Sequence, residues 1–538
     1  MLKKLIDLCL KCIENNLHLL RNLQESLPTK FKEVVIERLA CHDKFSPEYV
    51  SLIIQQLFSA LLKKISFHEC AQIDDDVLQK LSDSGCQLEC LTIDGCANVS
   101  DAGLQALLQN QRELITLELI FLPRVTGSCL RRVHSPAFQH IIVQEEHCDA
   151  LGLDNDALCS FIDNNRSLFF ICIHKAATSR PLTESHVSRI ITSIGQRLCH
   201  FYLTGNTAVS DYNLQELANK SKNLRTLKIR KLDETAWRTI TEKGLQILFR
   251  GCQHISDLNL CFYHELFERN HGTCSLPYFP ETLVSLTLDG SSIGMDEATF
   301  YDAFCRLPNL RKLDTNIDGI SADTLDRTLA KIGHQLRDLK MAYSSSHCTI
   351  MHSVMESVVN YCINLKSWTV YTCNHMTGRE LYPLLRDENR ASKLTCLKLW
   401  PVGHILYDVL MTVASSCQNL ETLTVCNSDV DDDMIMTLSR NCTNLKNIDL
   451  NGESASVTEE VLSQLAIHCP LSRVRLPRML HITDKTVKTM AYHCPFLEFV
   501  RFAGRARISP DTIKMLRDNC IKRVYIAYHP RLEEWSTT

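Results

Sequence analysis

LETLTVCNSDVDDDMIMTLSRNCTN (residues 420–444) is followed at once by LKNIDLNGESASVTEEVLSQLAIHCP (residues 445–470), and the two stretches share one pattern. Each opens with Leu-x-x-h-x-h, where h is apolar, and this alternation predicts a short strand with its apolar side chains in a core. A turn follows that carries Asp, Ser or Thr, residue types that cap the first turn of a helix. The remaining residues place apolar side chains at three-four spacing, which predicts an amphipathic helix.

The same pattern repeats along most of the chain. The last five segments open 25 or 26 residues apart, at Leu394, Leu420, Leu445, Leu471 and Leu497. This spacing lies in the leucine-rich-repeat range of about 20–29 residues. Traced back to Leu62 and forward to residues 523–526, the pattern gives about 17 or 18 units, with a weak unit at 134–152 and long loops within 230–282. We expect an α/β leucine-rich-repeat solenoid over residues 61–538, a horseshoe with parallel strands inside and helices outside, preceded by a helical segment over residues 1–60.

Composition gives the remaining bounds. The net charge of -4 favours neither nucleic acid nor an anionic membrane as a partner. No apolar run approaches the roughly 20 residues that span a bilayer. Asp7, Lys11 and Glu14 interrupt the apolar N-terminus, which argues against a secretory signal. We therefore expect a cytoplasmic or nuclear protein, in which the 26 cysteines are not disulfide-bonded.

The cysteines follow the repeat. Five stand three residues before a repeat-opening apolar residue and a sixth stands two before it: Cys252, Cys362, Cys417, Cys442 and Cys494, and then Cys469. Each would end its helix and turn into the core, where a free cysteine behaves as a small hydrophobe. This resembles the cysteine-containing, Amn-one-like leucine-rich repeats that are common in ubiquitin-ligase receptors.

Enzyme motifs are not supported. HELFERNH (residues 264–271) would need a second His at the place of Glu268 to bind zinc. Cys9 and Cys12 form a lone C-x-x-C with no second pair to complete a metal site. DVDDD (residues 429–433) falls at a strand-to-helix turn, where helix capping is the better interpretation. We expect a chain that is not itself an enzyme and that needs no metal or cofactor.

The N-terminal segment differs from the repeats. Leu5, Cys9 and Ile13 recur at every fourth residue and would share one stripe of an amphipathic helix. A second helix would start at Leu27-Pro28, because proline suits the first helical turn. Phe31 and Val35 follow in that helix at spacing four.

These residues resemble a VHL box, the adaptor-binding unit of Cullin-2 RING ubiquitin-ligase receptors. Leu5, Cys9 and Ile13 fill the pattern of an Elongin BC box in order. The cullin-2 box is filled in order by Leu27, Pro28, Phe31 and Val35. A VHL box ahead of cysteine-type leucine-rich repeats is similar to the Zyg-11/Zer-1 family of substrate receptors.

The resemblance implies a set of partners. The face of Leu5 and Cys9 would dock in a groove of Elongin C, which is bound to Elongin B, and the second helix would select the cullin. The repeats would then hold a protein target for ubiquitination, and the chain would supply proximity rather than chemistry. Three alternatives stay open: a helical cap alone, a ligase-independent scaffold that binds proteins through its repeats, and a degenerate F-box (residues 27–39) of a Skp-cullin ligase receptor.

The concave face is the expected target site. At its C-terminal end Arg475 and Arg501 would lie on adjacent strands, with Tyr525 next and with Arg505 and Tyr528 near. Arg and Tyr are favoured interface anchors, and clustered Arg suits acidic or phosphorylated segments. The alternative is a solvated face on which these residues cluster by chance. Of two nearby tryptophans, we expect Trp368 in the core and Trp400 just after its strand.

Overall fold

The structure, a computed structural model, describes most of the chain. The described residues are 2–20, 22–42, 44–145, 152–231, 240–261, 279–289, 297–317, 319–342, 349–373, 377–402, 405–426, 430–451, 457–476, 482–502, 508–520 and 524–528. They form two compact units, residues 1–266 and 267–538, which are described separately. The division falls within the irregular stretch that the sequence indicated at 230–282, and the N-terminal helices belong to the first unit.

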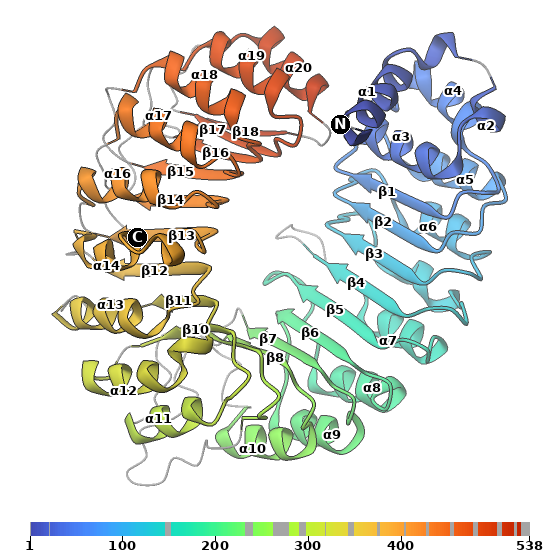
Figure 1. Cartoon of the computed structure of the whole chain (residues 1–538). Coiled ribbons are helices and arrows are strands. Elements are labelled where there is room, and N and C mark those ends of the chain that lie inside the picture. Colours follow the sequence, from blue (N-terminus) through green and yellow to red (C-terminus); the bar gives the residue numbers. More distant parts are fainter. Residues whose placement is uncertain are drawn as a thin grey trace. The chain divides into compact units, whose positions relative to one another are not determined.

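The strands of each unit pair in parallel with their neighbours in sequence (Figure 1). The first unit contains β1 (Lys64–His68), β2 (Cys90–Asp94), β3 (Thr116–Ile120), β4 (His140–Gln144), β5 (Phe170–Lys175), β6 (His200–Gly205), β7 (Thr226–Lys231) and β8 (Asp257–Cys261). The second contains β9 (Ser285–Asp289), β10 (Lys312–Asn316), β11 (Asp338–Ala342), β12 (Ser367–Cys373), β13 (Cys396–Val402), β14 (Thr422–Cys426), β15 (Asn447–Asn451), β16 (Arg473–Leu476), β17 (Phe499–Phe502) and β18 (Tyr525–Tyr528). The expected leucine-rich-repeat solenoid is confirmed.

The helices of the first unit form an N-terminal group and a repeat layer. The N-terminal group is α1 (Leu2–Asn15), the 3-10 helix η1 (Leu17–Leu19), α2 (Leu23–Ser26), α3 (Thr29–Cys41) and α4 (Pro47–Leu57). Between the strands follow α5 (Asp75–Asp83), α6 (Asp101–Leu108), η2 (Ser128–Arg132), α7 (Asn155–Asn164), α8 (Glu184–Ile194), α9 (Asp211–Lys220) and α10 (Glu242–Gly251).

The helices of the second unit cover one side of its strands (Figure 1). They are α11 (Glu297–Cys305), α12 (Ala322–Ile332), η4 (Gly333–Gln335), α13 (Thr349–Tyr361), η5 (Arg379–Leu381), α14 (Tyr382–Leu385), α15 (Glu388–Ala391), α16 (Tyr407–Ser416), α17 (Asp432–Asn441), α18 (Glu459–His468), α19 (Asp484–His493) and α20 (Pro510–Asn519). None of the helices in the described part of the chain combines the length and the apolar content that crossing a membrane requires.

Each repeat is completed by the one before it. Leu420, Leu423 and Val425 are fully buried, as the Leu-x-x-h-x-h pattern predicts. The backbone N–H groups of Glu421 and Thr422 both donate to the carbonyl of Thr395 in the preceding repeat, at 2.7 and 3.0 Å. The same forked bond recurs from repeat to repeat, and it satisfies backbone groups that burial would otherwise leave without partners.

The N-terminal helices close the first repeat. Helix α3 packs on β1, where no earlier repeat offers a carbonyl. The carboxylate of Glu33 takes that place: its Oε1 accepts from the backbone N–H groups of Lys63 at 2.7 Å and Lys64 at 2.8 Å. A side chain thus reproduces the acceptor that a backbone supplies in later repeats, so the segment acts as a cap.

The six repeat cysteines are buried, which confirms their structural role. Four of their thiols, those of Cys252, Cys442, Cys469 and Cys494, also donate hydrogen bonds toward the preceding repeat, which the sequence did not indicate. The thiol of Cys442 reaches the carbonyl of Cys417 at 3.3 Å, and that of Cys494 reaches the carbonyl of Ala466 at 3.4 Å. These acceptors lie at helix C-termini, where carbonyls lack intrahelical partners.

The acidic run at the start of α17 caps helices. Asp431 accepts from the backbone N–H of Met434 at 2.9 Å. Asp432 accepts from the backbone N–H and the hydroxyl of Thr458 in the next repeat, at 2.7 and 2.8 Å. The capping interpretation is confirmed for these two residues. Asp429 and the HELFERNH stretch lie outside the described residues.

The cap can be tested through Glu33. We expect Glu33→Ala to lower the free energy of unfolding of the first unit by about 1–3 kcal/mol, because two backbone N–H groups lose their acceptor. Glu33→Gln should cost less, since its amide oxygen can still accept. Amide hydrogen exchange at Lys63 and Lys64 and urea unfolding measure the effect. Glu37→Ala, one turn further along α3, is the matched control; equal losses for both alanines would contradict the role given to Glu33.

The buried thiols predict sensitivity to alkali. Burial raises the pKa to about 12 for Cys252, Cys362, Cys417, Cys442, Cys469 and Cys494. A thiol in the unfolded chain ionises near about 8.5. The stability that these thiols contribute is therefore complete below that pH and is lost as the pH rises from about 9 toward 12.

Urea unfolding between pH 8 and 10.5 measures this loss. In Cys442→Ala one titrating thiol is gone, so the decline above pH 9 should be shallower by up to about 1.4 kcal/mol per pH unit. A decline identical to that of the unaltered chain would count against the assignment.

Candidate functional site

Helix α1 turns two cysteines outward. Leu10 and Glu14 are buried on the side that faces the body of the first unit. Cys9 and Cys12 are exposed and Ile13 is half-buried. The side chain of Leu5 lies outside the described residues, although its backbone belongs to α1. The face of Cys9 and Cys12 is thus accessible, while the opposite face belongs to the core.

A buried charged cluster fixes α1 on α3. Arg38 Nη1 lies 3.3 Å from Glu14 Oε1, and His42 Nδ1 lies 3.8 Å from Glu14 Oε2. Burial raises the pKa of Glu14, and the charge and hydrogen bond of Arg38 oppose this rise. Breaking a buried pair of this kind is costly, because the partner keeps an uncompensated charge. The cluster therefore holds α1 at a defined angle and leaves its outer face free to bind.

The second motif is partly accessible. Helix α3 begins at Thr29, directly after Pro28, so the expected proline-started helix is present. Pro28 is exposed, whereas Leu27 and Phe31 are half-buried. Val35 is completely buried in the chain's own core and has no surface to offer a partner in this conformation. Of the four residues of this motif, three can reach another protein.

Strand register corrects the predicted C-terminal patch. Arg475 pairs with Arg501 as expected, but Ala527, not Tyr525, lies opposite Arg501. Tyr525 lies beside Phe499 and remains on the concave side, where it is exposed. The placement of Tyr525 next to Arg501 was wrong. The apolar residues Val524 and Ile526 had suggested that these two side chains point inward. The position of Cys520, three residues before the repeat opens, indicates the register that the structure shows.

Two further residues of the predicted patch have side chains outside the described residues. The backbone of Tyr528 pairs with that of Phe502, in the row that continues Leu476. Arg505 lies outside the described residues.

Of the aromatic residues on the strands of the second unit, some lie in the core and others on the concave side, according to their position in the strand. Trp368 is completely buried, as expected. Trp400 lies within β13, two residues before the strand end, and pairs with Tyr371 of β12 on the concave side. Its expected place after the strand was therefore wrong, but its partial exposure places it in the same surface as Arg475.

These residues line a groove of about 480 Å³ on the concave side of the second unit, which we call the concave groove. Its main aromatic and charged lining residues are Tyr371, Lys398, Trp400, Asp449, Arg473 and Arg475. Of these, Arg475 is anchored twice: Nη1 lies 3.6 Å from Asp449 Oδ2, and its guanidinium carbon lies 5.0 Å from the centre of the Phe499 ring.

The floor of the concave groove is polar. Thr424 and Asp449 are buried. Burial raises the pKa of Asp449, and the charges of Arg475, Arg501 and Lys398 oppose that rise. Because the local dielectric is lower here than in water, charges in this groove interact more strongly than on an open surface.

The first unit carries an aromatic row that the sequence analysis did not recognise. Phe170 lies between His140 and His200 with ring centroids 5.5 Å away on either side, and Tyr202 is 5.3 Å from Phe170. Burial lowers the pKa of both histidines, so their rings are predominantly neutral at pH 7. The signal was present in LFFICIHK (168–175), where concave positions are apolar as well as core positions.

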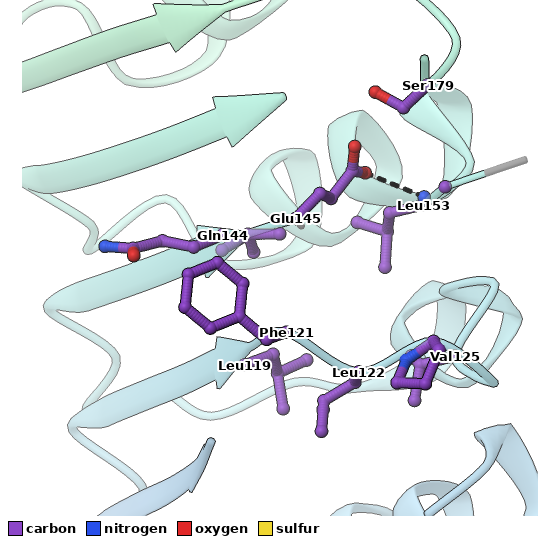
Figure 2. A pocket seen from close by; sticks show the side chains of 11 residues that line it. Leu119, Phe121, Leu122, Val125, Gln144, Glu145, Leu153 and Ser179 are labelled. Carbon is purple, nitrogen blue, oxygen red and sulfur yellow. Dashed lines mark hydrogen bonds between the residues drawn. The ribbon is translucent and has the colours of Figure 1, made fainter. Parts of the chain in front are cut away.

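A small cavity lies where β3 and β4 end (Figure 2). Figure 2 shows the carboxylate of Glu145 accepting from the backbone N–H of Leu153, at 2.8 Å. The fully buried Lys175 also binds that carboxylate, at 2.5 Å. With a volume of about 70 Å³ the cavity can hold a few water molecules but no metabolite. The Glu145 carboxylate therefore joins the segment at Leu153 to the ends of β4 and β5.

In the described part of the chain, no group of three or more His, Cys, Asp or Glu side chains is placed to hold a metal ion. The exposed C-x-x-C of α1 belongs to no such group, so the geometry assigns no metal ligand there.

Comparison with known proteins identifies no family. No protein-family model matches the chain. Among solved structures it is similar to the crystal structure of the Rad7 and Elc1 complex in yeast, at 13% identity over 80% of this chain and 89% of that one, with a TM-score of 0.42. A likeness this remote does not assign a partner.

Proposed function

We propose that this chain is the substrate-recognition subunit of an Elongin BC–Cullin-2 RING ubiquitin ligase. Helix α1 would bind Elongin C, the region of Leu27, Pro28 and Phe31 would select the cullin, and the repeats would hold a protein target. The chain would do no chemistry of its own; it would raise the local concentration of the target near the ubiquitin donor.

The exposed face of α1 is the observation that carries this proposal. A purely structural cap would bury its apolar positions, yet Cys9 and Cys12 are exposed while Leu10 and Glu14 hold the helix in place. A rigid helix with an accessible apolar stripe suits helix-in-groove recognition, because little conformational entropy is lost on binding. Capping and adaptor binding use opposite sides of the same segment, so the two functions are compatible.

Capture of the Elongin B–Elongin C complex tests the proposal. We expect the full chain to co-purify with it, and Leu5→Ser combined with Cys9→Phe to weaken binding by about 30-fold, which corresponds to about 2 kcal/mol for two anchor positions. Calorimetric titration of the purified proteins gives the affinities.

The matched control is Gln55→Phe, which places the same bulky ring at an exposed position of α4. It should bind like the unaltered chain. If the unaltered chain fails to bind Elongin C, the proposal is lost, and binding through the repeats alone would indicate a ligase-independent scaffold. Capture of a Skp-type adaptor in its place would indicate an F-box receptor.

A second variant separates cullin choice from adaptor binding. Leu27→Ala with Phe31→Ala removes two half-buried side chains at the start of α3. We expect Elongin C binding to persist and Cullin-2 recovery from the assembled complex to fall about tenfold or more, because hot-spot side chains dominate such interfaces. Equal recovery of Cullin-2 with both chains would remove the cullin assignment while leaving the adaptor assignment intact.

A further inference from the structure

One wall of the concave groove is aromatic. Tyr371 of β12 and Trp400 of β13 pair in register, so neighbouring strands present two aromatic side chains side by side. Both are partly exposed. The ring of Tyr371 also receives the ammonium of Lys340 at 5.1 Å from its centre, which helps to fix it. Flat aromatic surface of this kind binds an apolar or aromatic side chain at low entropic cost.

The opposite wall is cationic. The side chain of Arg473 is 62% exposed, and its closest described carboxylate, that of Glu498, lies 3.9 Å away. The side chain of Arg475 is 42% exposed although Asp449 and Phe499 hold it. Arg501 pairs with Arg475 on the next strand, and its Nε is buried without a hydrogen-bond partner. Two accessible guanidinium groups are thus presented side by side, and that of Arg475 is held in place by Asp449 and Phe499.

The charges in the groove do not balance. Lys398, Arg473 and Arg475 contribute three positive charges to the lining, against the single carboxylate of Asp449. That carboxylate is buried and bound to Arg475, and its charge also acts on Lys398 and Arg501, while the carboxylate of Glu498 lies 3.9 Å from Arg473. With Arg501 and Glu498 included, four cations stand against two carboxylates, which leaves a surplus of two positive charges. The surplus is local, because the whole chain carries a net charge of -4. A ligand that complements this surface is anionic at one end and apolar at the other.

The strand spacing sets the length of that ligand. From Trp400 on β13 to Arg473 on β16 there are three strand-to-strand steps, or about 14 Å at about 4.8 Å each. Arg473 lies in the row of Cys396, four residues before Trp400, which adds about 13 Å along the strands at about 3.3 Å per residue. The two positions are therefore about 20 Å apart, a distance that an extended peptide covers in about six residues. Between the two walls, Thr424 and Asn447 offer polar groups that suit a peptide backbone.

We propose that the concave groove binds an extended anionic peptide segment, with an apolar side chain on Tyr371 and Trp400 and a carboxylate or phosphate about six residues away on Arg473 and Arg475. This inference deepens the proposed function, since such a segment would be the recognition element of the ligase target. Aspartate, glutamate and phosphoserine share the required chemistry, and a bidentate guanidinium contact fits each of them.

Binding is measured by fluorescence anisotropy with the full chain and labelled decapeptides. Each decapeptide carries one phenylalanine followed six residues later by Glu-Glu, by phosphoserine or by Gln-Gln. We expect at least one anionic peptide to bind about tenfold or more tightly than the Gln-Gln peptide, and to weaken as sodium chloride rises from 50 to 500 mM. The relative affinities of the Glu-Glu and phosphoserine peptides distinguish the two sources of charge.

Two groove variants and one control locate the site. Arg473→Glu alters an exposed side chain and should leave the fold intact while weakening the anionic peptides about tenfold or more. Trp400→Ala should weaken the binding of the anionic peptides. It should also abolish their preference over a peptide in which serine replaces the phenylalanine. Lys488→Glu, which makes an equal charge change at an exposed position of α19, should bind like the unaltered chain. Circular dichroism melting checks that every variant is folded.

Several outcomes would overturn the inference. These are equal affinity for neutral and anionic peptides, unchanged binding by Arg473→Glu, no binding at millimolar peptide, or tighter binding of a single-stranded RNA oligonucleotide than of any peptide. Elongin C capture by the same preparations is recorded in parallel. A chain that binds Elongin C but no anionic peptide loses only this inference, and the converse result loses only the proposed function.

Discussion

The structure depends on one forked hydrogen bond. In successive repeats, a single carbonyl of one repeat accepts from two consecutive backbone N–H groups of the next, as the carbonyl of Thr395 does for Glu421 and Thr422. Neither the carbonyl nor the two N–H groups could be buried without the other, because an unsatisfied buried peptide group costs several kcal/mol. A single repeat is therefore not stable in isolation. The continuous concave side of the strands and the aligned cysteines both follow from the stacking of units that complete one another.

This constraint explains why the N-terminal segment can serve two purposes. Glu33 meets the requirement of the first repeat, and the cluster of Glu14, Arg38 and His42 fastens α1 to the helix that carries Glu33. These inner contacts leave Cys9 and Cys12 exposed on the outer side of α1. Because the helix is held by its buried side, capping is compatible with the adaptor docking that we propose for the exposed side.

The sequence predicted the fold well, because strand and helix periods are local signals. The spacing of Leu420 from Leu445 was enough to predict parallel strands, and the position of Cys442 before Leu445 was enough to place that thiol in the core. The Glu33 contact could not be predicted, since it joins residues about thirty positions apart and replaces a backbone group by a side chain. At Tyr525 the prediction failed because the final strand is apolar on both sides, so alternation alone did not fix its register. The same loss of alternation concealed Phe170.

The direction of the inter-repeat bonds has a consequence for biosynthesis. The forked backbone bonds and the thiols of Cys442 and Cys494 donate toward the N-terminal side, although the N–H groups at the strand ends, such as that of Gly95, donate to the following repeat. At the forked bonds, therefore, each repeat presents an acceptor to its successor. A ribosome releases the chain in that same order. The first acceptor, on Glu33, is therefore synthesised before the first strand. Each later repeat can then pack on a preceding repeat that already supplies its backbone acceptor. The repeats can therefore fold one after another during synthesis, beginning on the N-terminal cap.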